Sequence, residues 1–290
     1  MHPHKLVRVV LWMVGALLSF STMAVSIRAL SLHGFGIFEI LTVRSAVALV
    51  VLSALLITRP EFRLQVRPRR MRIHLLRNIV HYISQCGWTL ALTVLPLATV
   101  FALEFTMPAW TALLAVWLLH ERMTPSRAGV VALGFVGVLV ILRPGIASFN
   151  PAVFLVLAAA FGYAITMITT KQLTATETTF SIVFWMNVIQ APLSLALSDP
   201  KLLLQFGFGD LVPILGVGIA GMTSHYCLSN AFRSGDATLV VPLDFMRIPL
   251  IALVGWLLYG ERLDIFVPLG ALIIVVGVVW NLRSETLHGR

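Results

Sequence analysis

The stretch LATVFALEFTMPAWTALLAVWLLHER at residues 97–122 is matched 140 positions later by ATLVVPLDFMRIPLIALVGWLLYGER at residues 237–262. Both stretches are apolar almost throughout, both have an acidic residue at the eighth position, and both end in Glu-Arg. The acidic residues are Glu104 and Asp244. Apolar matches are common in a hydrophobic chain, whereas matching charges are rare. The two stretches therefore indicate an internal duplication.

The composition of the whole chain predicts a lipid environment. Its 290 residues are 59% hydrophobic and 11% charged, and the mean hydropathy is +0.94. Soluble domains are about 45–50% apolar and about 25% charged. This surplus of apolar surface has to face a solvent other than water. The two cysteines, Cys86 and Cys227, lie in apolar segments and are expected to be packed thiols.

Ten apolar segments are candidates to cross a bilayer core of about 30 Å as helices. They are residues 9–30, 37–57, 73–93, 98–118, 128–142, 152–170, 180–197, 211–231, 237–259 and 265–282. The predicted fold is an all-α membrane protein with ten transmembrane helices. A barrel is not expected, because these segments are apolar on all faces and do not alternate. The connections are short, so no separate soluble domain is predicted.

The duplication divides the chain into two repeats, residues 1–147 and 148–290, with five predicted spans each. Because five is an odd number, the second repeat enters the membrane from the opposite side. Inverted repeats of this kind support alternating access, in which two halves rearrange around a central cavity. Channels can be built in the same way, so the symmetry alone does not identify a carrier.

The basic residues predict the orientation of the chain. With a cytoplasmic N-terminus, fifteen lysines and arginines fall on that side and four on the other, while Arg44 and Arg247 lie within spans. The positive-inside rule then places both termini in the cytoplasm. The net charge of +9 follows from this topology signal, and no nucleic-acid partner is expected.

Four ionisable residues fall inside predicted spans, where each costs about 2.5–3.5 kcal/mol and is expected to face a cavity or a partner. Glu104 and Asp244 are repeat mates, so they are expected near the axis that relates the halves. Asp244 and Arg247 are three residues apart and could form an ion pair on one helix face. Three interpretations are open for Glu104: a proton or cation site, a substrate contact, or neutralisation by Arg44.

Polar residues on two further spans suggest a lined cavity. His81, Gln85 and Trp88 recur at the spacing of one helix face, and His225 and Asn230 lie in the eighth span. These histidines belong to no metal-ligand motif, so neither a metal nor a cofactor is expected. The predicted substrate-binding residues are His81, Tyr82, Gln85, Trp88, Glu104, Phe105, Tyr163, His225, Tyr226, Asn230, Asp244 and Arg247.

Short motifs at matching places in the two repeats resemble the drug/metabolite transporter superfamily, specifically its EamA-type permeases. These motifs are Ala91, Leu95-Pro96, Ala98, Pro108 and His120-Glu121-Arg122 in the first repeat, and Ala231, Ala237 and Gly260-Glu261-Arg262 in the second. The resemblance covers nearly the whole chain. It implies a basket of helices around a central cavity and a secondary transporter, often an exporter, of amino acids or other metabolites.

The chain departs from the family pattern at two places. His120 stands where glycine is common. Phe105 and Met107 stand where aromatic amino-acid exporters of the YddG type have a tyrosine and a tryptophan, which argues against an aromatic amino-acid substrate.

The predicted function is a secondary transporter, with export of amino acids or related small metabolites as the expected activity. The absence of a P-loop pattern argues against ATP as the driving force, and both proton coupling and passive exchange fit the sequence. No enzyme activity is expected, although a membrane enzyme or a channel is the alternative. Family analogy predicts a bacterial inner membrane. The sequence predicts no oligomeric state.

Overall fold

The computed structural model describes residues 3–67, 69–119, 123–143, 150–234, 240, 243–244, 246–262 and 264–288. Within these ranges every regular element is helical. The fold is therefore all-α, as the sequence predicts.

The half predicted as the first repeat contains α1 to α6, and the half predicted as the second contains α7 to α13. The helices are α1 (Pro3–Leu32), α2 (Ile37–Thr58), α3 (Met71–Val94), α4 (Leu97–Glu104), α5 (Met107–Leu119), α6 (Pro125–Leu142), α7 (Ala152–Thr174), α8 (Thr179–Leu197), α9 (Pro200–Leu203), α10 (Leu211–Ser234), α12 (Arg247–Tyr259) and α13 (Phe266–His288). Short 3-10 turns occur at Pro60–Phe62 and Phe208–Asp210.

Six segments are long and apolar enough to cross a membrane by length and composition. They are Val7–Leu32, Ile37–Thr58, Leu97–Leu114, Ala152–Thr170, Thr179–Leu197 and Phe208–Leu228. Three shorter apolar helices are Ala128–Leu142, Arg247–Tyr259 and Phe266–Asn281. Helix α3 has 24 residues, carries Arg72 and Arg77, and belongs to neither group. These ten segments overlap the ten predicted spans, and six of them meet the length and hydropathy of a membrane span.

The fourth predicted span is broken rather than merely bent. Helix α4 ends at Glu104 and α5 begins at Met107, with Phe105 and Thr106 between them. Pro108 accounts for the break, because it has no N–H to donate to the carbonyl of Glu104 four residues earlier. Most of the matching segment in the second repeat, before α12, lies outside the described residues, and so does Pro242.

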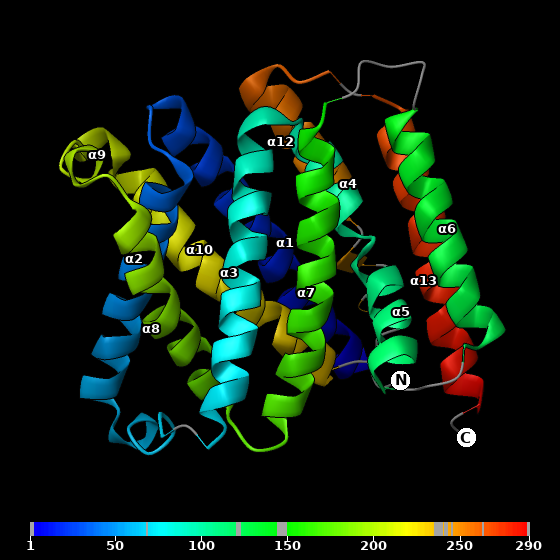
Figure 1. Cartoon of the computed structure of the whole chain (residues 1–290), viewed down its shortest axis with the longest axis horizontal. Helices are drawn as coiled ribbons and strands as arrows, with labels where there is room; N and C mark the ends of the chain where they lie inside the picture. Colours follow the sequence, from blue (N-terminus) through cyan, green and yellow to red (C-terminus); the bar gives the residue numbers. More distant parts are fainter. Residues whose placement is uncertain are drawn as a thin grey trace.

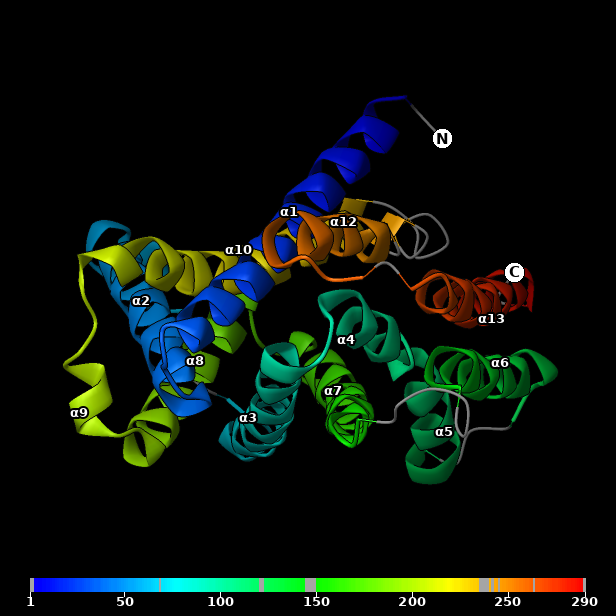
Figure 2. The ribbon, with the colours of Figure 1, turned by 90° about the horizontal axis from the view of Figure 1, so that it is seen from above.

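The helices pack mainly across the two repeats (Figure 1). Helix α1 runs along α10, and α3 runs along α7. Seen from above, α10, α1 and α12 form one row and α3, α7 and α5 the other (Figure 2). The pairs α2–α8 and α6–α13 lie at opposite edges, and α4 packs between the rows against α12 and α7. This arrangement places α3, α4, α10 and α12 around the centre.

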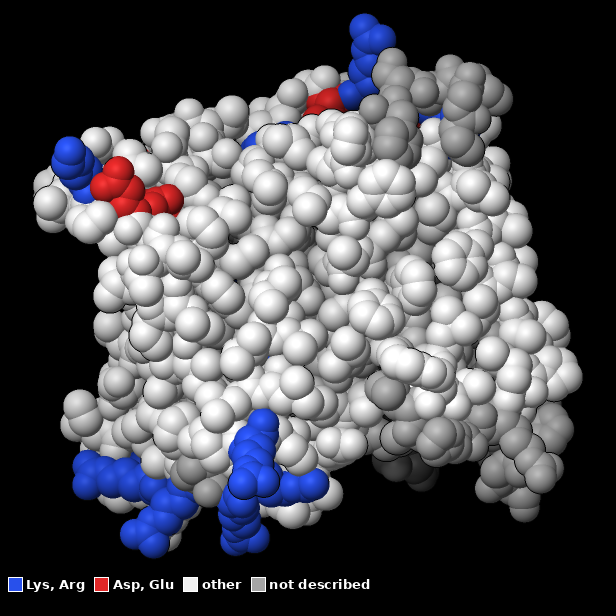
Figure 3. All heavy atoms as spheres, viewed as in Figure 1, with Lys and Arg blue, Asp and Glu red and all other residues white. Residues whose placement is uncertain are grey.

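The outer surface is suited to lipid. On the face in Figure 3 a broad band without charged side chains separates charged groups at the two ends of the bundle. Large apolar side chains such as Val50, Ile83 and Leu139 are exposed on this surface. The hydrophobic core lies inside and includes Phe101, Leu97 and Ile251, which are fully buried. The protein is accordingly a multi-pass membrane protein.

Helices α6 and α13 touch through their backbones. A Cβ on Gly137 would lie 2.5 Å from the carbonyl oxygen of Gly270, and a Cβ on Gly270 would lie 2.5 Å from that of Gly137. Small residues allow such close approach, and close approach maximises van der Waals contact where lipid provides no hydrophobic driving force. These two glycines therefore allow the backbones of α6 and α13 to approach each other closely.

We expect Gly270→Ala to destabilise the folded protein by about 1–3 kcal/mol, because the added methyl group overpacks this contact. Thermal unfolding in detergent measures the effect. Gly209→Ala is the control, since a Cβ there meets nothing within 4 Å. Equal melting temperatures for the two variants would contradict the packing interpretation.

Candidate functional site

The polar stripe of α3 faces the interior, as predicted. His81, Gln85, Trp88 and Tyr82 are all buried, whereas Ile83 on the same helix is exposed. A spacing of i, i+4 and i+7 keeps His81, Gln85 and Trp88 on one helix face. The packing of α3 against α7 and α8 turns this face toward the centre of the bundle.

Glu104, Asp244 and Arg247 form one connected set. Arg247 Nη2 donates to Asp244 Oδ2 at 2.5 Å, and Arg247 Nη1 lies 3.4 Å from Glu104 Oε1. Trp88 Nε1 donates to the other Glu104 oxygen at 2.8 Å. The predicted Asp244–Arg247 pair is confirmed, and the partner of Glu104 is Arg247 rather than Arg44. We call these four residues the acidic set.

Aromatic rings surround the Arg247 guanidinium. Its central carbon lies 4.0 Å from the ring centre of Phe20, 5.4 Å from Phe105 and 5.6 Å from Phe101. Cation–π contacts of this kind stabilise a desolvated cation. The structure thus brings the predicted Phe105 into the site. Phe20 has no signal in the sequence, because it is one of 17 phenylalanines in a largely apolar chain.

Arg44, Gln190 and His81 form a second connected set. Arg44 Nη2 donates to Gln190 Oε1 at 2.8 Å, and Gln190 Nε2 lies 2.9 Å from His81 Nδ1 and donates to the Asn78 carbonyl at 3.2 Å. Arginine only donates, so the amide oxygen has to face Arg44 and the amide nitrogen has to face His81. His81 Nδ1 therefore accepts, and His81 Nε2 carries the proton. Arg44, Gln190 and His81 are called the basic set.

Arg77 extends the positive charge of this region. It donates to Thr170 Oγ1 at 2.7 Å and to Asn78 Oδ1 at 2.6 Å. No carboxylate among the described residues forms an ion pair with Arg44 or Arg77. A buried charge without a counter-charge costs several kcal/mol, so the neutral hydrogen-bond partners of Arg44 and Arg77 are an unusual feature of a buried region.

Rings connect the two sets. Phe20 packs edge-on against His225 with ring centres 5.8 Å apart, and His225 lies 6.3 Å from His81. Tyr163 lies 5.5 Å from His81 on the other side. The predicted residues His81, His225 and Tyr163 thus meet at the centre. The described residues contain no group of three histidine, cysteine or acidic side chains able to hold a metal.

Two predicted residues lie away from this centre. Tyr226 is 53% exposed and packs edge-on against Trp12 at 5.9 Å. The Asn230 side chain donates to the carbonyl of Tyr226 at 2.8 Å. Adjacent helix residues point about 100° apart, so turning His225 inward turns Tyr226 outward. Sequence alone did not distinguish these neighbours.

Three residues in or beside the basic set are not among the predicted substrate-binding residues. Gln190 is one of them, because a polar residue inside a span also serves as a helix–helix contact. Asn78 was omitted, although it precedes His81 by three residues and so shares its face. Arg77 was counted as a topology signal. Buried positions for Arg77 and Asn78 could have been inferred from their place on the polar face of α3, whereas Gln190 lies on α8.

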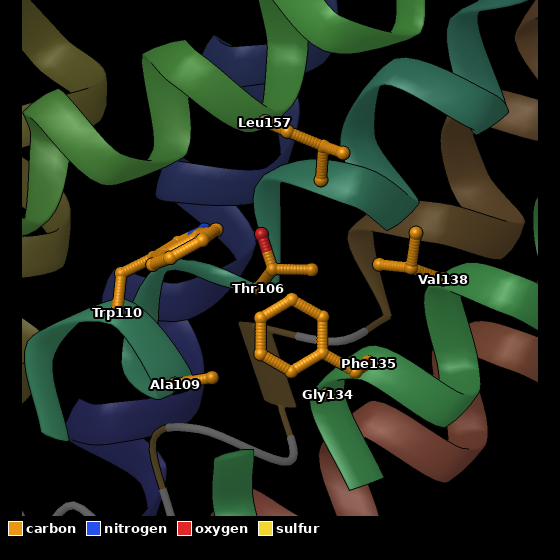
Figure 4. A pocket seen from close by; sticks show the side chains of 7 residues that line it. All are labelled: Thr106, Ala109, Trp110, Gly134, Phe135, Val138 and Leu157. Carbon is orange, nitrogen blue, oxygen red and sulfur yellow. The ribbon is translucent and has the colours of Figure 1, made fainter. Parts of the chain in front are cut away.

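An apolar pocket lies outside both sets, between α5, α6 and α7 (Figure 4). Its empty volume is about 250 Å³, and its lining residues are Thr106, Ala109, Trp110, Gly134, Phe135, Val138 and Leu157. None of the predicted substrate-binding residues lines it. It begins at the break between α4 and α5, where the helix is interrupted.

The Gly-Glu motif of the second repeat connects helices at one end of the bundle. Glu261 forms an ion pair with Arg28 at 3.1 Å and accepts from the backbone N–H of Leu97 at 2.9 Å. Arg28 also donates to the carbonyls of Leu92 and Leu95. Gly260 has φ +61°, which glycine tolerates best, and this ends α12 just before Glu261. The matching Glu121 lies outside the described residues.

The model of the EamA-like transporter family matches the chain twice, over residues 7–143 and 150–283. The chain belongs to the EamA-like transporter family. The resemblance to the drug/metabolite transporter superfamily is thereby confirmed.

Several transporters with named substrates are similar to the chain. An S-adenosylmethionine uptake transporter of Rickettsia felis is 28% identical over 220 residues, covering 76% of this chain and 74% of the relative. A riboflavin transporter of Vibrio cholerae is 29% identical over 282 residues, covering 97% and 94%. A pseudopaline exporter of Pseudomonas aeruginosa is 24% identical over 217 residues, covering 73% and 75%. These relatives are transporters of metabolites.

A solved crystal structure has the same fold as the EamA-like chain. The two align over 94% of this chain and 95% of the other, with a TM-score of 0.61 and 16% sequence identity.

Arg247 is the only cation described in the acidic set, so its removal should lower the stability of the folded protein. We expect Arg247→Met to destabilise the protein by about 3–5 kcal/mol, because Glu104 and Asp244 are then left without a counter-charge. Adding Glu104→Gln to this variant should recover part of the loss. Thermal unfolding of the single and double variants measures the coupling, with the exposed Arg262→Met as the control. Simple additivity would contradict the prediction.

Proposed function

We propose that this protein is a secondary transporter that moves amino acids or amino-acid-derived metabolites by alternating access around the acidic and basic sets. The observation that supports this most directly is the linkage of Glu104 and Asp244, which occupy equivalent positions in the two repeats, through Arg247 at the centre. A site composed of both repeats changes whenever the repeats move relative to one another.

The proposed architecture is ten spans in two inverted repeats. The separate matches of the family model to each half support the duplication. The helix packing supports a symmetric arrangement as well. If α1 corresponds to α7 and α3 to α10, the α1–α10 pair is equivalent to the α7–α3 pair. In this correspondence, the pairs α2–α8 and α6–α13 each join a helix of one repeat to its counterpart in the other. With five spans in each repeat, the second is inverted.

The proposed location is a bacterial inner membrane with both termini in the cytoplasm. In Figure 1 both chain ends lie toward the same end of the bundle as the connection between α2 and α3. That connection carries Arg59, Arg63, Arg67, Arg69 and Arg70, and basic side chains gather there in Figure 3. Under the positive-inside rule this end faces the cytoplasm.

Alternating access requires contacts that can separate at each end. Toward the outside, Glu261 joins α12 to α1 and to the start of α4. Toward the cytoplasm, Arg77 joins α3 to Thr170 of α7, and Trp185 of α8 donates to the carbonyl of Val66 at 2.9 Å. Opening one end would break one group of contacts while the other persists. We propose that the two groups exchange during transport.

The substrate class rests on the polarity of the site and on the names of the relatives. Carboxylates, guanidinium groups and aromatic rings suit a solute that carries both charge and a ring or an apolar part. The family members named for S-adenosylmethionine and for riboflavin fit this description. Names for uptake and for export both occur among the relatives, so we expect direction to follow the gradients. In a cell that synthesises the solute, the concentration gradient would drive export.

Reconstitution in liposomes tests the carrier directly. We expect saturable counterflow of at least one labelled solute from a panel of S-adenosylmethionine, methionine, threonine, phenylalanine and riboflavin. Saturable exchange defines a carrier, because it requires a binding step in every cycle. Flux that rises linearly with concentration would identify a channel instead. No flux of any of these solutes would contradict the proposal.

Glu104→Gln tests whether the acidic set belongs to the transport site. We expect exchange of the transported solute to fall at least about tenfold, because a loss near 1.4 kcal/mol in binding corresponds to this factor. The control is Glu61→Gln, the same chemical change on an exposed side chain of the α2–α3 connection. Equal rates for the two variants would exclude Glu104 from the site. A lost response to a pH gradient would assign proton coupling to Glu104.

A further inference from the structure

The two sets at the centre differ in charge. The acidic set has two carboxylates and one guanidinium, so it lacks one positive charge. The basic set has the guanidinium of Arg44, and over the described ranges no carboxylate is paired with it. The rings of Phe20, His225 and His81 lie between them. The interior therefore has a negative pole and a positive pole.

Each pole has a polar atom without a partner. Arg44 is only 3% exposed, and its Nε is buried with no hydrogen-bond acceptor among the residues that the structure describes. At the other pole, Arg247 Nε is buried with no hydrogen-bond acceptor and Asp244 Oδ1 is buried with no hydrogen-bond donor in the same part of the chain. Buried polar atoms are nearly always paired in native proteins, so an exception calls for an explanation. A ligand with an acceptor at one end and a donor at the other would satisfy both.

The surroundings of Arg44 hold its guanidinium in place. Its amide partner Gln190 comes from α8, and Gly221 of α10 packs beside its aliphatic stem, where a Cβ would make ordinary contact at 3.6 Å from Arg44 Cγ. The same amide orients His81, so that the protonated Nε2 is a second donor at this pole. Tyr163 packs against His81 with ring centres 5.5 Å apart and adds an aromatic ring beside this pole.

We propose that Arg44 binds the carboxylate of a zwitterionic substrate, while the cationic group of the same molecule faces Glu104 and Asp244. This inference rests on the proposed transport function and assigns the substrate class and its orientation. A carboxylate supplies the acceptor that Arg44 Nε lacks, and two parallel hydrogen bonds are the preferred geometry of this pair. An ammonium or sulfonium group supplies the missing positive charge at the acidic set.

A zwitterionic amino-acid group neutralises both the positive pole and the negative pole, which a neutral ring does not. A neutral isoalloxazine such as that of riboflavin leaves both Arg44 and the extra carboxylate without counter-charges. S-Adenosylmethionine has a carboxylate at one end of its methionine part and an ammonium and a sulfonium near it, with an adenine ring for aromatic contacts. A compound of this kind is the chemistry that we assign to the site.

The test compares two probes that differ only in the carboxylate. S-Adenosylmethionine and its decarboxylated analogue compete for exchange in liposomes that contain the full-length protein. We expect the wild-type protein to prefer S-adenosylmethionine by about 10- to 100-fold, which is the usual effect of a hydrogen-bonded charge pair. In Arg44→Gln this preference should fall to about twofold or less, with little change for the decarboxylated analogue. Arg44→Lys should retain part of the preference.

Two further variants separate recognition from folding. Gln190→Glu gives Arg44 a carboxylate of the protein itself, so the site stays neutralised but the preference for S-adenosylmethionine should be lost. Arg59→Gln removes an exposed arginine and should leave the preference unchanged. Correct folding of each variant is checked by its elution as a single species in detergent.

Three results would overturn the proposal. The wild-type protein could accept both probes equally. Arg44→Gln could weaken both probes by the same factor, which would make Arg44 a structural residue. Exchange of riboflavin without any exchange of S-adenosylmethionine would also overturn the zwitterion assignment, while the carrier function would stand. If no solute exchanged at all, the proposed transport function itself would be contradicted.

Discussion

A guanidinium inside a membrane has to find its counter-charges within the protein, because the bilayer core contains no water to provide them. Arg247 finds one in each half of the chain, Asp244 beside it and Glu104 across the bundle. This requirement brings the break between α4 and α5 to the centre and directs Trp88 of α3 onto Glu104. The rest of the central arrangement depends on these ion pairs, since each connects different helices.

Much of this arrangement could be predicted from periodicity and from the rarity of charge. The inward face of α3 and the Asp244–Arg247 pair follow from spacing alone. Other features depend on tertiary packing. Helix α10 turns His225 inward and Tyr226 outward, a choice set by the neighbours of the helix. Phe20 is indistinguishable in sequence from a lipid-facing phenylalanine. The full break at Pro108 depends on local hydrogen bonding that a hydropathy pattern does not contain.

The structure also gives different roles to Glu261 and Glu104, two acidic residues that lie in the matching stretches of the sequence. Glu261 lies in the repeated Glu-Arg motif, and it joins helices at one end of the bundle rather than contributing to the centre. Glu104 has the same charge and lies in the same repeated stretch, yet it sits at the centre. Their different partners divide the stretch into a part that forms the site and a part that holds the surrounding helices together.

The packing of α1 on α10 and of α3 on α7 makes the two halves of the chain depend on each other for their packing. Each of these contacts joins one half of the chain to the other, and the main hydrophobic core contains residues of both halves. Cutting the polypeptide between residues 147 and 148 would leave both pieces with large unmatched helix faces. The two halves are thus not separate packing units, because each covers helix faces of the other.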